Sequence, residues 1–343
     1  MIHKLYETGS LTAEELLDLI INRTPERREL LRELAEKRRQ EVYGRDVFIR
    51  GLIEFSNICR QNCYYCGIRC GNTKVQRYRL TVDEILSCCH SGYKLGFRTF
   101  VLQGGEDPHF TDDIFVEIIT KIKAFYPDCA VSLSLGERSY ESFKRLREAG
   151  ADRYLMRHET ADAEHYSMLH PENLSLASRM EALKNLKSLG YQTGCGFMVG
   201  SPFQKPEHIV KDLLFIKEFQ PEMVGIGPFM PQKDTPFGDK PAGSVELTLY
   251  LLSITRLLLP NVLLPATTAL GSAQQGGRES GVLAGANVVM PNLSPTDVRD
   301  KYTLYDNKLS IGAESIEGLN ALRKSMRDIG YEVVTDRGDA ARE

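Results

Sequence analysis

Three cysteines, Cys59, Cys63 and Cys66, form a C-x3-C-x2-C run directly after the apolar stretch 48–55. Cysteine thiolates hold iron–sulfur clusters in proteins. Three thiolates on one short loop can hold three irons of a [4Fe–4S] cube and leave the fourth iron free. A free iron can bind and reduce a substrate, whereas a fully ligated cube only stores an electron. The run therefore predicts one [4Fe–4S] cluster with an open iron, ligated by these three cysteines.

Two other sites could use the same cysteines. A structural zinc site would need a fourth Cys or His at a matching spacing. A ferredoxin-type cluster uses four cysteines, and Cys70 follows Cys66 after three intervening residues. However, the first gap of the run is three residues rather than two, and Gly71 rather than proline follows Cys70. We therefore expect Cys70 not to be a ligand. An iron–sulfur carrier with Cys70 as fourth ligand is the non-enzymatic alternative.

The segment 157–160, Arg-His-Glu-Thr, places four polar residues at the end of an expected strand. Arg157 could bind an anion through its planar guanidinium, and Glu159 could accept hydrogen bonds from a ribose or an amino group. Arg179, on the helix that follows, could reach a carboxylate. The alternative is an internal salt-bridge cluster, and for His158 core packing and ligand contact are both open.

Glycines and hydroxyls mark three further places where a ligand could bind. In Gly104-Gly105-Glu106, the glycines allow a close backbone approach, so that carbonyls could accept hydrogen bonds from an ammonium group. Thr267 and Thr268 could bind a small polar or anionic substrate, although β-strands favour threonine in any case. Tyr302 and Tyr305 could line the mouth of a cavity or fill its last layer, and packing is the simpler interpretation.

Short apolar runs alternate with amphipathic segments from residue 48 onward. The expected strands are 49–55, 99–103, 130–135, 153–158, 192–199, 223–228, 263–267 and 287–290. The amphipathic segments between them are 81–95, 111–125, 139–148, 176–189, 206–219 and 245–258. This alternation predicts an α/β fold, a (βα)8 barrel of the TIM type, with a doubly wound open sheet as the alternative. In such a barrel the chemistry collects at the carboxyl ends of the strands, where these motifs fall.

Three parts are predicted along the chain: an N-terminal helical extension at 1–45, the barrel at 46–310 and a C-terminal helix-strand tail at 311–343. In the extension, Thr12 and Glu15 predict a capping box, and Pro25 opens a second helix. Within the barrel, the segment 271–279 is expected to be a flexible glycine-rich loop that opens a helix.

The composition is that of a globular protein able to bury a core: 42% of the 343 residues are hydrophobic and 26% are charged. The net charge of −3 argues against nucleic acid as a partner. The most apolar segment, 247–266, is interrupted by Arg256, Pro260 and Pro265, so it is not expected to span a membrane. Eight cysteines without a secretory leader predict reduced thiols and a cytoplasmic location.

Nine segments together closely resemble the HydE-type [FeFe]-hydrogenase maturases, which are radical S-adenosylmethionine (SAM) enzymes. They are Arg50, 54–57, 59–66, 103–108, 132–137, 150–154, 157–160, 223–229 and 264–269. The cysteine run alone specifies only the radical SAM superfamily, whereas the combined stretches are much more specific. The resemblance covers nearly the whole chain after about residue 8.

The resemblance implies a barrel that holds SAM and one [4Fe–4S] cluster, with Cys59, Cys63 and Cys66 as ligands and no residue acting as acid or base. Tyr65, Gln103, Gly104, Ser134, Glu159, Arg179, Met198 and Met223 would surround SAM. Arg50, Ser132, Arg157, Thr267, Thr268, Tyr302 and Tyr305 would line substrate and anion sites deeper in the cavity.

The resemblance also implies a substrate and partners. The substrate would be a mononuclear iron complex carrying cysteine, CO and cyanide, supplied by HydG, and a radical would attack one of its sulfurs. The product would pass toward the hydrogenase diiron cluster through HydF, and a ferredoxin- or flavodoxin-type protein would supply electrons.

One departure from the family pattern concerns a second cluster. Some family members carry three further cysteines near the C-terminus, but this chain has none after Cys195. One cysteine-bound cluster is therefore expected, and a biotin-synthase-like role, which needs a second cluster, has little support. A radical SAM amino-acid mutase resembling methylornithine synthase is the alternative enzyme.

Overall fold

Parallel strands arranged as a ring form the centre of the molecule, in a computed structural model that describes residues 1–309 and 316–341. The largest sheet has six strands in the order β2-β3-β4-β5-β6-β8, and its ladders are parallel. These strands are β2 (Gly51–Ser56), β3 (Thr99–Gly104), β4 (Ala130–Ser134), β5 (Arg153–Leu155), β6 (Gln192–Cys195) and β8 (Met223–Val224). Their order follows the chain, so each crossover joins neighbouring strands, as in an α/β barrel.

Short pairings and single bridges complete the ring. Strand β1 (Asp46–Ile49) lies between β10 (Val288–Val289) and β11 (Glu332–Val334). Parallel bridges join Met223 to Leu263, Pro265 to Val288, and Asn292 to Leu52. The pair β7 (Met198–Val199) and β9 (Gly227–Pro228) continues β6 and β8 at their carboxyl ends. The predicted α/β barrel class is confirmed, although one side of the ring rests on bridges rather than on continuous ladders.

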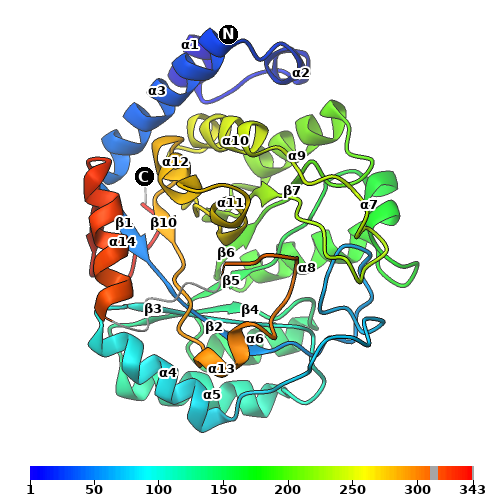
Figure 1. Cartoon of the computed structure of the whole chain (residues 1–343), viewed down its shortest axis with the longest axis vertical. Coiled ribbons are helices and arrows are strands. Elements are labelled where there is room, and N and C mark those ends of the chain that lie inside the picture. The colour runs from blue at the N-terminus through cyan, green and yellow to red at the C-terminus, as the bar shows by residue number, and fades with distance from the viewer. Residues whose placement is uncertain (310–315, 342–343) are drawn as a thin grey trace.

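Helices surround the ring (Figure 1). They are α4 (Val82–Lys94), α5 (Asp112–Phe125), α6 (Tyr140–Glu148), α7 (Ala163–Leu169), α8 (Leu176–Ser188), α9 (Pro206–Phe219), α10 (Val245–Leu258), α11 (Thr268–Ala273), α12 (Gly277–Leu283) and α13 (Thr296–Arg299). Several begin at a Ser or Thr whose side chain accepts from the third helical amide, such as Thr81, Thr111 and Ser139. Helices α4, α5 and α8 bury an apolar face against the strands. Each large apolar side chain so buried contributes about 1.5–3 kcal/mol.

The N-terminal helices are α1 (Ile2–Thr8), α2 (Ala13–Ile21) and α3 (Pro25–Tyr43). The capping box predicted for Thr12 and Glu15 is present, and Pro25 opens α3. Helix α3 packs along α10 (Figure 1). The fully buried Arg39 side chain donates to the carbonyls of Gly44 and Ala286, which ties α3 to the barrel.

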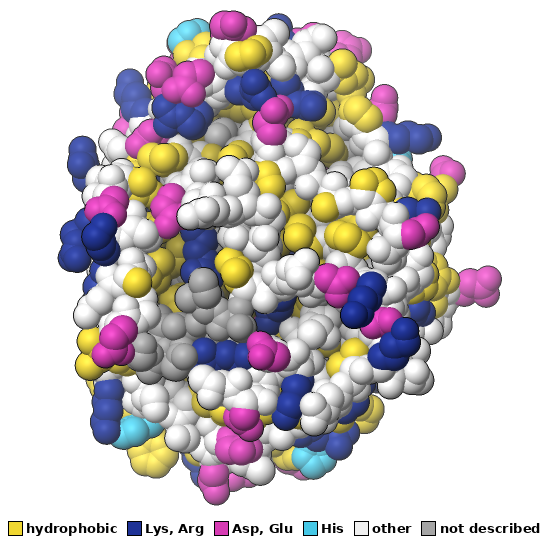
Figure 2. All heavy atoms as spheres, in the orientation of Figure 1, with side chains coloured by type: hydrophobic (Ala, Val, Ile, Leu, Met, Phe, Trp, Pro, Cys, Tyr) yellow, Lys and Arg dark blue, Asp and Glu magenta, His cyan; other side chains and the backbone are white. Residues whose placement is uncertain are grey.

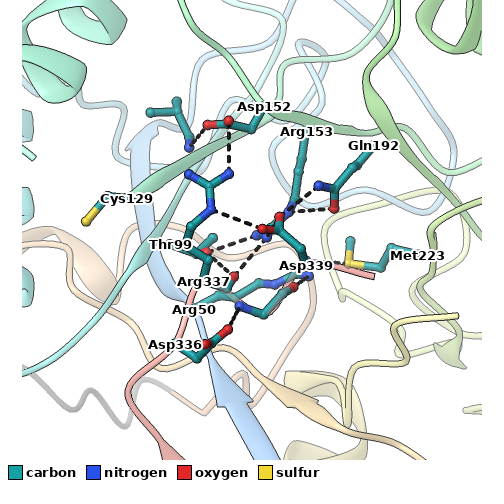
Figure 3. A network of polar contacts seen from close by, with 12 residues as sticks. Arg50, Thr99, Cys129, Asp152, Arg153, Gln192, Met223, Asp336, Arg337 and Asp339 are labelled. Carbon is teal, nitrogen blue, oxygen red and sulfur yellow. Dashed lines mark hydrogen bonds and ion pairs between the residues drawn. The ribbon is translucent and has the colours of Figure 1, made fainter. Parts of the chain in front are cut away.

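At the C-terminus, α14 (Ile316–Asp328) leads into β11, which adds a parallel strand to β1. The residues after β11 then cross the amino-terminal ends of the barrel strands, called here the lower end of the barrel (Figure 3). The predicted boundary between barrel and tail, at residues 310 and 311, lies outside the described residues, and the division into three parts stays a prediction.

The strands expected at 192–199 and 223–228 are each interrupted, and two other expected elements differ more from the structure. The segment 263–267 is not a continuous strand but makes two single bridges, and Pro265 has no amide proton to donate to a ladder. The segment 271–279 is largely helical, at the end of α11 and the start of α12, rather than a flexible loop. Leu270 and Val282 are buried and anchor these two short helices, so tertiary packing outweighs the glycines.

The outer surface carries both signs of charge. Basic and acidic side chains are interspersed over the face drawn in Figure 2. In the described part of the chain, no helix combines the length and the apolar character needed to cross a membrane.

Candidate active site

One cavity of about 310 Å³ brings most of the predicted site residues together. Of the residues expected around the cluster and SAM, its walls contain Cys59, Cys63, Cys66, Tyr65, Gln103, Gly104, Ser134, Glu159, Arg179 and Met198. Of the residues expected at the substrate, they contain Arg157, Tyr302 and Tyr305. The cavity therefore joins cysteines from one loop with side chains from the carboxyl ends of β3 to β7.

The conformation of the cysteine loop is fixed by Arg77. Its guanidinium donates to the carbonyls of Ile68 at 2.8 Å, Arg69 at 2.7 Å and Asn72 at 2.9 Å, and also to that of Asn57. Hydrogen bonds from a charged group contribute about 1.5–3 kcal/mol each. A single side chain thus holds both ends of the loop that carries the cysteines.

The turn after β3 packs directly on the cysteine loop. A Cβ on Gly105 would lie 2.2 Å from the Ile58 carbonyl oxygen, so only glycine fits there. The next residue, Glu106, accepts hydrogen bonds from Arg60 Nε at 3.0 Å and Gln61 Nε2 at 2.7 Å. The second glycine of the Gly-Gly-Glu motif therefore has a clear role in bringing β3 and the loop together.

The sulfur atoms of the run lie in surroundings that suit iron–sulfur ligands. Cys59 Sγ accepts hydrogen bonds from the amides of Gln61 and Glu106, both at 3.4 Å. Burial raises the pKa of Cys66 to about 12, and it also raises the pKa values of Cys59 and Cys63. Metal ligation requires thiolates, so binding iron must displace these protons. Three such cysteines on one cavity wall fit a [4Fe–4S] cluster with an open iron.

Cys70 lies apart from this arrangement. Its side chain is exposed and does not line the cavity, while its amide donates to the Gln61 carbonyl at 2.9 Å. Among the described residues, no three Cys, His, Asp or Glu side chains converge on a single metal ion. In a cube each thiolate binds a different iron, so the three sulfurs of the run need not converge in this way.

Tyr65 is oriented by a residue that the sequence analysis did not select. His170 Nδ1 donates to the Tyr166 carbonyl at 2.9 Å, which leaves Nε2 as an acceptor for the Tyr65 hydroxyl at 3.1 Å. Burial lowers the pKa of His170 to about 4, which keeps the ring neutral at neutral pH. His170 is 105 residues from Tyr65, and no spacing or motif links the two in the sequence.

Two arginine–glutamate pairs lie at the cavity, whose lining includes Arg157, Glu159 and Arg179 but not Glu137. Arg157 Nη2 lies 2.9 Å from Glu159 Oε2, and Arg179 Nε lies 2.7 Å from Glu137 Oε1. These four atoms form ion pairs but not aligned hydrogen bonds, and each is buried with no hydrogen-bond partner in the described residues. Buried polar groups are normally satisfied. The unused donors and acceptors fit the amino, carboxylate and ribose groups of SAM.

Glu159 has a left-handed backbone, with a φ of 67°. For a residue with a side chain this conformation costs about 1–2 kcal/mol. Its neighbour His158 is fully buried, bonds to Asp212 and the Gly196 amide, and does not line the cavity. The choice left open for His158 by the sequence is therefore settled in favour of core packing.

A second, narrow pocket lies toward the lower end of the barrel (Figure 3). It has about 10 Å³ of space, enough for one water molecule. Arg50, Ser132 and Met223 line it rather than the main cavity, and Leu155 lines both. Ser132 and Ser134 lie on the same face of β4, about 7 Å apart along the strand. The pocket therefore lies about two residues along β4 below the cavity, on the side of the strand's amino-terminal end.

Arg50 is the chief polar group of this pocket. Its side chain is buried, with Nη1 2.7 Å from Met223 Sδ and Nε without a partner in the described residues. Two residues after the bridge from Pro265 to Val288, Thr267 Oγ1 is also buried without a partner in the described residues, and Thr268 begins α11. Arg50, Ser132, Met223, Thr267 and Thr268 therefore lie outside the main cavity, and the ligand contacts expected of them stay predictions.

Comparisons with known proteins agree with this geometry. Residues 53–216 match the Radical SAM superfamily. The chain is 43% identical over 314 residues to the [FeFe] hydrogenase maturase subunit HydE of Thermotoga maritima, across 92% of this chain and 89% of that protein. The crystal structure of methylornithine synthase (PylB) has a TM-score of 0.84 and 28% identity over 97% of both chains. A crystal structure of HydG, a maturase of the [FeFe]-hydrogenase, has a TM-score of 0.80 over 96% of this chain and 74% of that one.

The two structural neighbours and the HydE sequence carry different weight. At 20% identity, HydG shows a likeness of fold alone. The HydE sequence is similar along almost its full length, and the three cysteines share one cavity with the other residues expected around SAM, except Met223. An identity of 43% over 92% of the chain is more than a shared fold requires. The chain therefore belongs to the HydE family of [FeFe] hydrogenase maturases, within the Radical SAM superfamily.

Proposed function

We propose that this protein is the radical SAM maturase that acts on a mononuclear iron complex carrying cysteine, CO and cyanide during assembly of the [FeFe]-hydrogenase diiron subcluster. The observation that supports it best is the single cavity that Cys59, Cys63 and Cys66 share with Arg157 and Glu159. A cluster, SAM and a third compound can react together only if one enclosed space holds all three.

In this proposal Cys59, Cys63 and Cys66 hold one [4Fe–4S] cluster. Tyr65, Gln103, Gly104, Ser134, Glu159, Arg179 and Met198 hold SAM, and Met223 contributes from below. When bound, the cluster and SAM supply a 5′-deoxyadenosyl radical through one-electron cleavage of SAM. Apolar side chains such as Leu155, Met156 and Met230 keep water out of the space in between.

Charged side chains of the cavity orient the two ligands. Arg179 and Glu159 offer an unused donor and an unused acceptor to the amino-acid and ribose parts of SAM. Arg157 has two unused guanidinium atoms, Nε and Nη2, which suit the anionic cysteine carboxylate or cyanide of the iron complex. Burial raises the pKa of Tyr305 to about 12, so its hydroxyl keeps its proton and can donate at neutral pH.

A matched pair of cysteine variants tests the cluster assignment. Wild type, Cys63→Ala and Cys70→Ala are reconstituted with iron and sulfide without oxygen, and bound iron, EPR spectra with and without SAM, and 5′-deoxyadenosine are measured. We expect the EPR spectrum of the wild type to shift when SAM is added, and the spectrum of Cys70→Ala to shift in the same way. Cys63→Ala should lose the cluster and SAM cleavage. Loss of the cluster in Cys70→Ala, with spectra indifferent to SAM, would favour an iron–sulfur carrier.

A second candidate is an amino-acid mutase, favoured by the TM-score of 0.84 with methylornithine synthase over the whole chain. The two enzymes differ in what stimulates SAM cleavage. A maturase should form 5′-deoxyadenosine faster with the iron complex made by HydG, and should transfer product to HydF, while free amino acids have no effect. Stimulation by amino acids alone would favour the mutase. The same assay can compare ferredoxin and flavodoxin as electron donors.

A further inference from the structure

Glu159 reaches the cavity from a backbone conformation that depends on groups outside the cavity. Its left-handed φ of 67° is rare for a residue with a side chain. The Glu159 amide donates to the Gly196 carbonyl at 3.0 Å, and its carbonyl accepts from the Met198 amide at 3.4 Å. These bonds attach Glu159 to the junction of β6 and β7. The residues around it, His158 and Ala161, are instead held by the carboxyl group of Asp212.

Asp212 binds the chain on both sides of Glu159. It lies in the middle of α9 and is fully buried. Its Oδ1 accepts from the Ala161 amide at 2.5 Å and from His158 Nε2 at 3.2 Å. His158 precedes Glu159 and Ala161 follows it by two positions, so one carboxyl oxygen brackets the left-handed residue.

His158 connects this carboxyl group to the strand that holds Glu159. Its Nδ1 accepts from the Gly196 amide at 3.3 Å, which places the ring proton on Nε2, facing Asp212. The ring packs against Phe197 and Phe215, with centroid distances of 5.9 and 4.8 Å. Since Gly196 also accepts from the Glu159 amide, the imidazole joins α9 to β6 at the point where Glu159 is attached.

The second oxygen of Asp212 shows that this residue is poorly placed for stability alone. Oδ2 is buried without a hydrogen-bond partner in the described residues, and leaving such a group unpaired is unfavourable. Both contacts that Asp212 makes are through Oδ1, and both fix the backbone around Glu159. Neither Asp212 nor His158 lines the cavity, so any influence on a ligand is indirect, through the residues on either side of His158, Arg157 and Glu159, which do line it.

We propose that Asp212 and His158 are positioning residues that hold Glu159 in its left-handed conformation, direct its carboxylate into the cavity and thereby set the affinity for SAM. The inference rests on the proposed function, because it takes Glu159 as a SAM ligand. It adds Asp212, from α9, to the residues that serve the site, and gives His158, within the 157–160 segment, a positioning role in place of ligand contact.

The test compares two changes at Asp212. Asp212→Leu removes the acceptor at similar volume, whereas Asp212→Asn keeps an oxygen where Oδ1 lies. The SAM dissociation constant is measured by anaerobic equilibrium titration of the reconstituted protein, and chemical unfolding is measured separately without SAM. Asp212→Leu should weaken SAM binding roughly tenfold, with kcat at saturating SAM changed less than about twofold. Asp212→Asn should bind SAM like the wild type.

Two further measurements separate positioning from general loss of stability. Tyr191→Phe removes another buried hydrogen bond, from the Tyr191 hydroxyl to the Phe143 carbonyl at 2.7 Å, away from the cavity. This variant should lose stability and keep its SAM affinity. If Asp212 acts through Glu159, adding Asp212→Leu to Glu159→Gln should weaken SAM binding little beyond Glu159→Gln alone, because the two effects share one contact.

Failure of the inference can be told apart from failure of the proposed function. If the wild-type protein does not bind SAM, the proposed function itself is wrong. A wild type that binds SAM, together with unchanged affinity in Asp212→Leu or additive effects in the double variant, overturns the positioning role. If Asp212→Leu does not fold, His158→Phe replaces it, because a phenyl ring fits between Phe197 and Phe215 and lacks both hydrogen bonds.

Discussion

The two arginines of the cavity are each paired with a glutamate: Arg157 with Glu159 in the same lining, and Arg179 with Glu137, which lies outside it. Burying four unpaired charges would be costly, and pairing lowers that cost. Because neither pair forms an aligned hydrogen bond, Arg157 can turn toward an incoming carboxylate without first breaking one, whereas Arg179 is also held by its Nη1 hydrogen bond to the Arg157 carbonyl at 3.1 Å. Pairing thus limits the cost of burying these charges in a cavity that is proposed to bind a zwitterion such as SAM.

The protonation of Asp212 should make stability depend on pH. Burial raises the pKa of Asp212 well above the ordinary 3.8. The ionisable groups around it include His158, His208, Glu159, Asp162 and Cys195. Burial lowers the pKa of His158 to about 3, so His158 is neutral at neutral pH. The folded protein then holds a proton that the unfolded chain releases. The free energy of unfolding should therefore fall as pH rises above 3.8, by at most about 1.4 kcal/mol per pH unit.

Asp212→Asn provides the matched reference for this pH dependence, because an amide does not titrate. Urea unfolding of both proteins from about pH 5 to about pH 8 gives the difference in unfolding free energy. We expect the wild type to lose stability relative to Asp212→Asn across this range. A constant difference would show that Asp212 is ionised in the folded protein throughout.

At the scale of the elements, the β6–β7 junction leaves no room for a side chain at Gly196. Gly196 has a φ of 152°, and a Cβ there would lie 2.0 Å from the Gly225 carbonyl oxygen on the neighbouring chain segment between β8 and β9. The same residue donates to His158 and accepts from Glu159. Gly196 therefore serves two purposes. It allows its chain segment to approach the one that carries Gly225, and it holds Glu159 in place.

Gly196→Ala should accordingly destabilise the fold by about 3 kcal/mol or more, since backbone must move to admit the methyl group. Gly190→Ala is the matched control: its φ of 76° is also left-handed, but no atom lies within 4 Å of the added Cβ. That change should cost about 1 kcal/mol. Chemical unfolding of both variants checks the difference. Equal losses would mean that conformational strain, not the contact with Gly225, is what glycine avoids at this junction.

Sequence patterns predicted these elements well where the signal is local. The capping box of Thr12 and Glu15, the proline start of α3 and the cysteine run each lie within a few consecutive residues. The prediction of a continuous strand at 263–267 is wrong, because apolar periodicity does not reveal that Leu263 and Pro265 make only single bridges. Local pattern specifies element type, whereas ladder length is decided by neighbours distant in the chain.

The same limit explains which site residues the sequence could not reveal. His170 orients Tyr65 and Arg77 holds the cysteine loop, but each does so through contacts formed only after folding. Met223 was expected around SAM, yet it faces Arg50 in the lower pocket, one step below the cavity. Which strand a residue is on can be predicted, but its height within the barrel depends on register.

At the scale of the whole molecule, the C-terminal segment closes the lower end of the barrel (Figure 3). The Arg337 carbonyl accepts from Thr99 Oγ1 at 2.7 Å and from Arg153 Nη2 at 2.8 Å. Asp339 accepts from Arg153 and Gln192, both at 2.7 Å. Burial tends to raise the pKa of Asp339, but these hydrogen bonds and the nearby arginine charges outweigh it and lower that pKa overall.

Asp339→Ala should destabilise the protein by about 1–3 kcal/mol, because Arg153 is buried and loses its carboxylate. Asp328→Ala is the matched control, since it removes an exposed ion pair with Lys324 and should change stability by less than about 0.5 kcal/mol. Chemical unfolding measures both, and hydrogen exchange at Thr99 and Gln192 should rise only in Asp339→Ala. Unchanged exchange there would show that the tail does not seal the strand ends.

The closed lower end also limits the side from which a ligand could enter the barrel. With Arg337 and Asp339 across the strand starts, ligands reach the interior from the cysteine loop side. Anything that binds near Arg50 or Ser132 must pass the position of Ser134 and Glu159, where SAM would lie. Under the proposed function, a compound held deeper than SAM would have to enter before it and leave after it, so the barrel would work as a dead-end chamber rather than a passage.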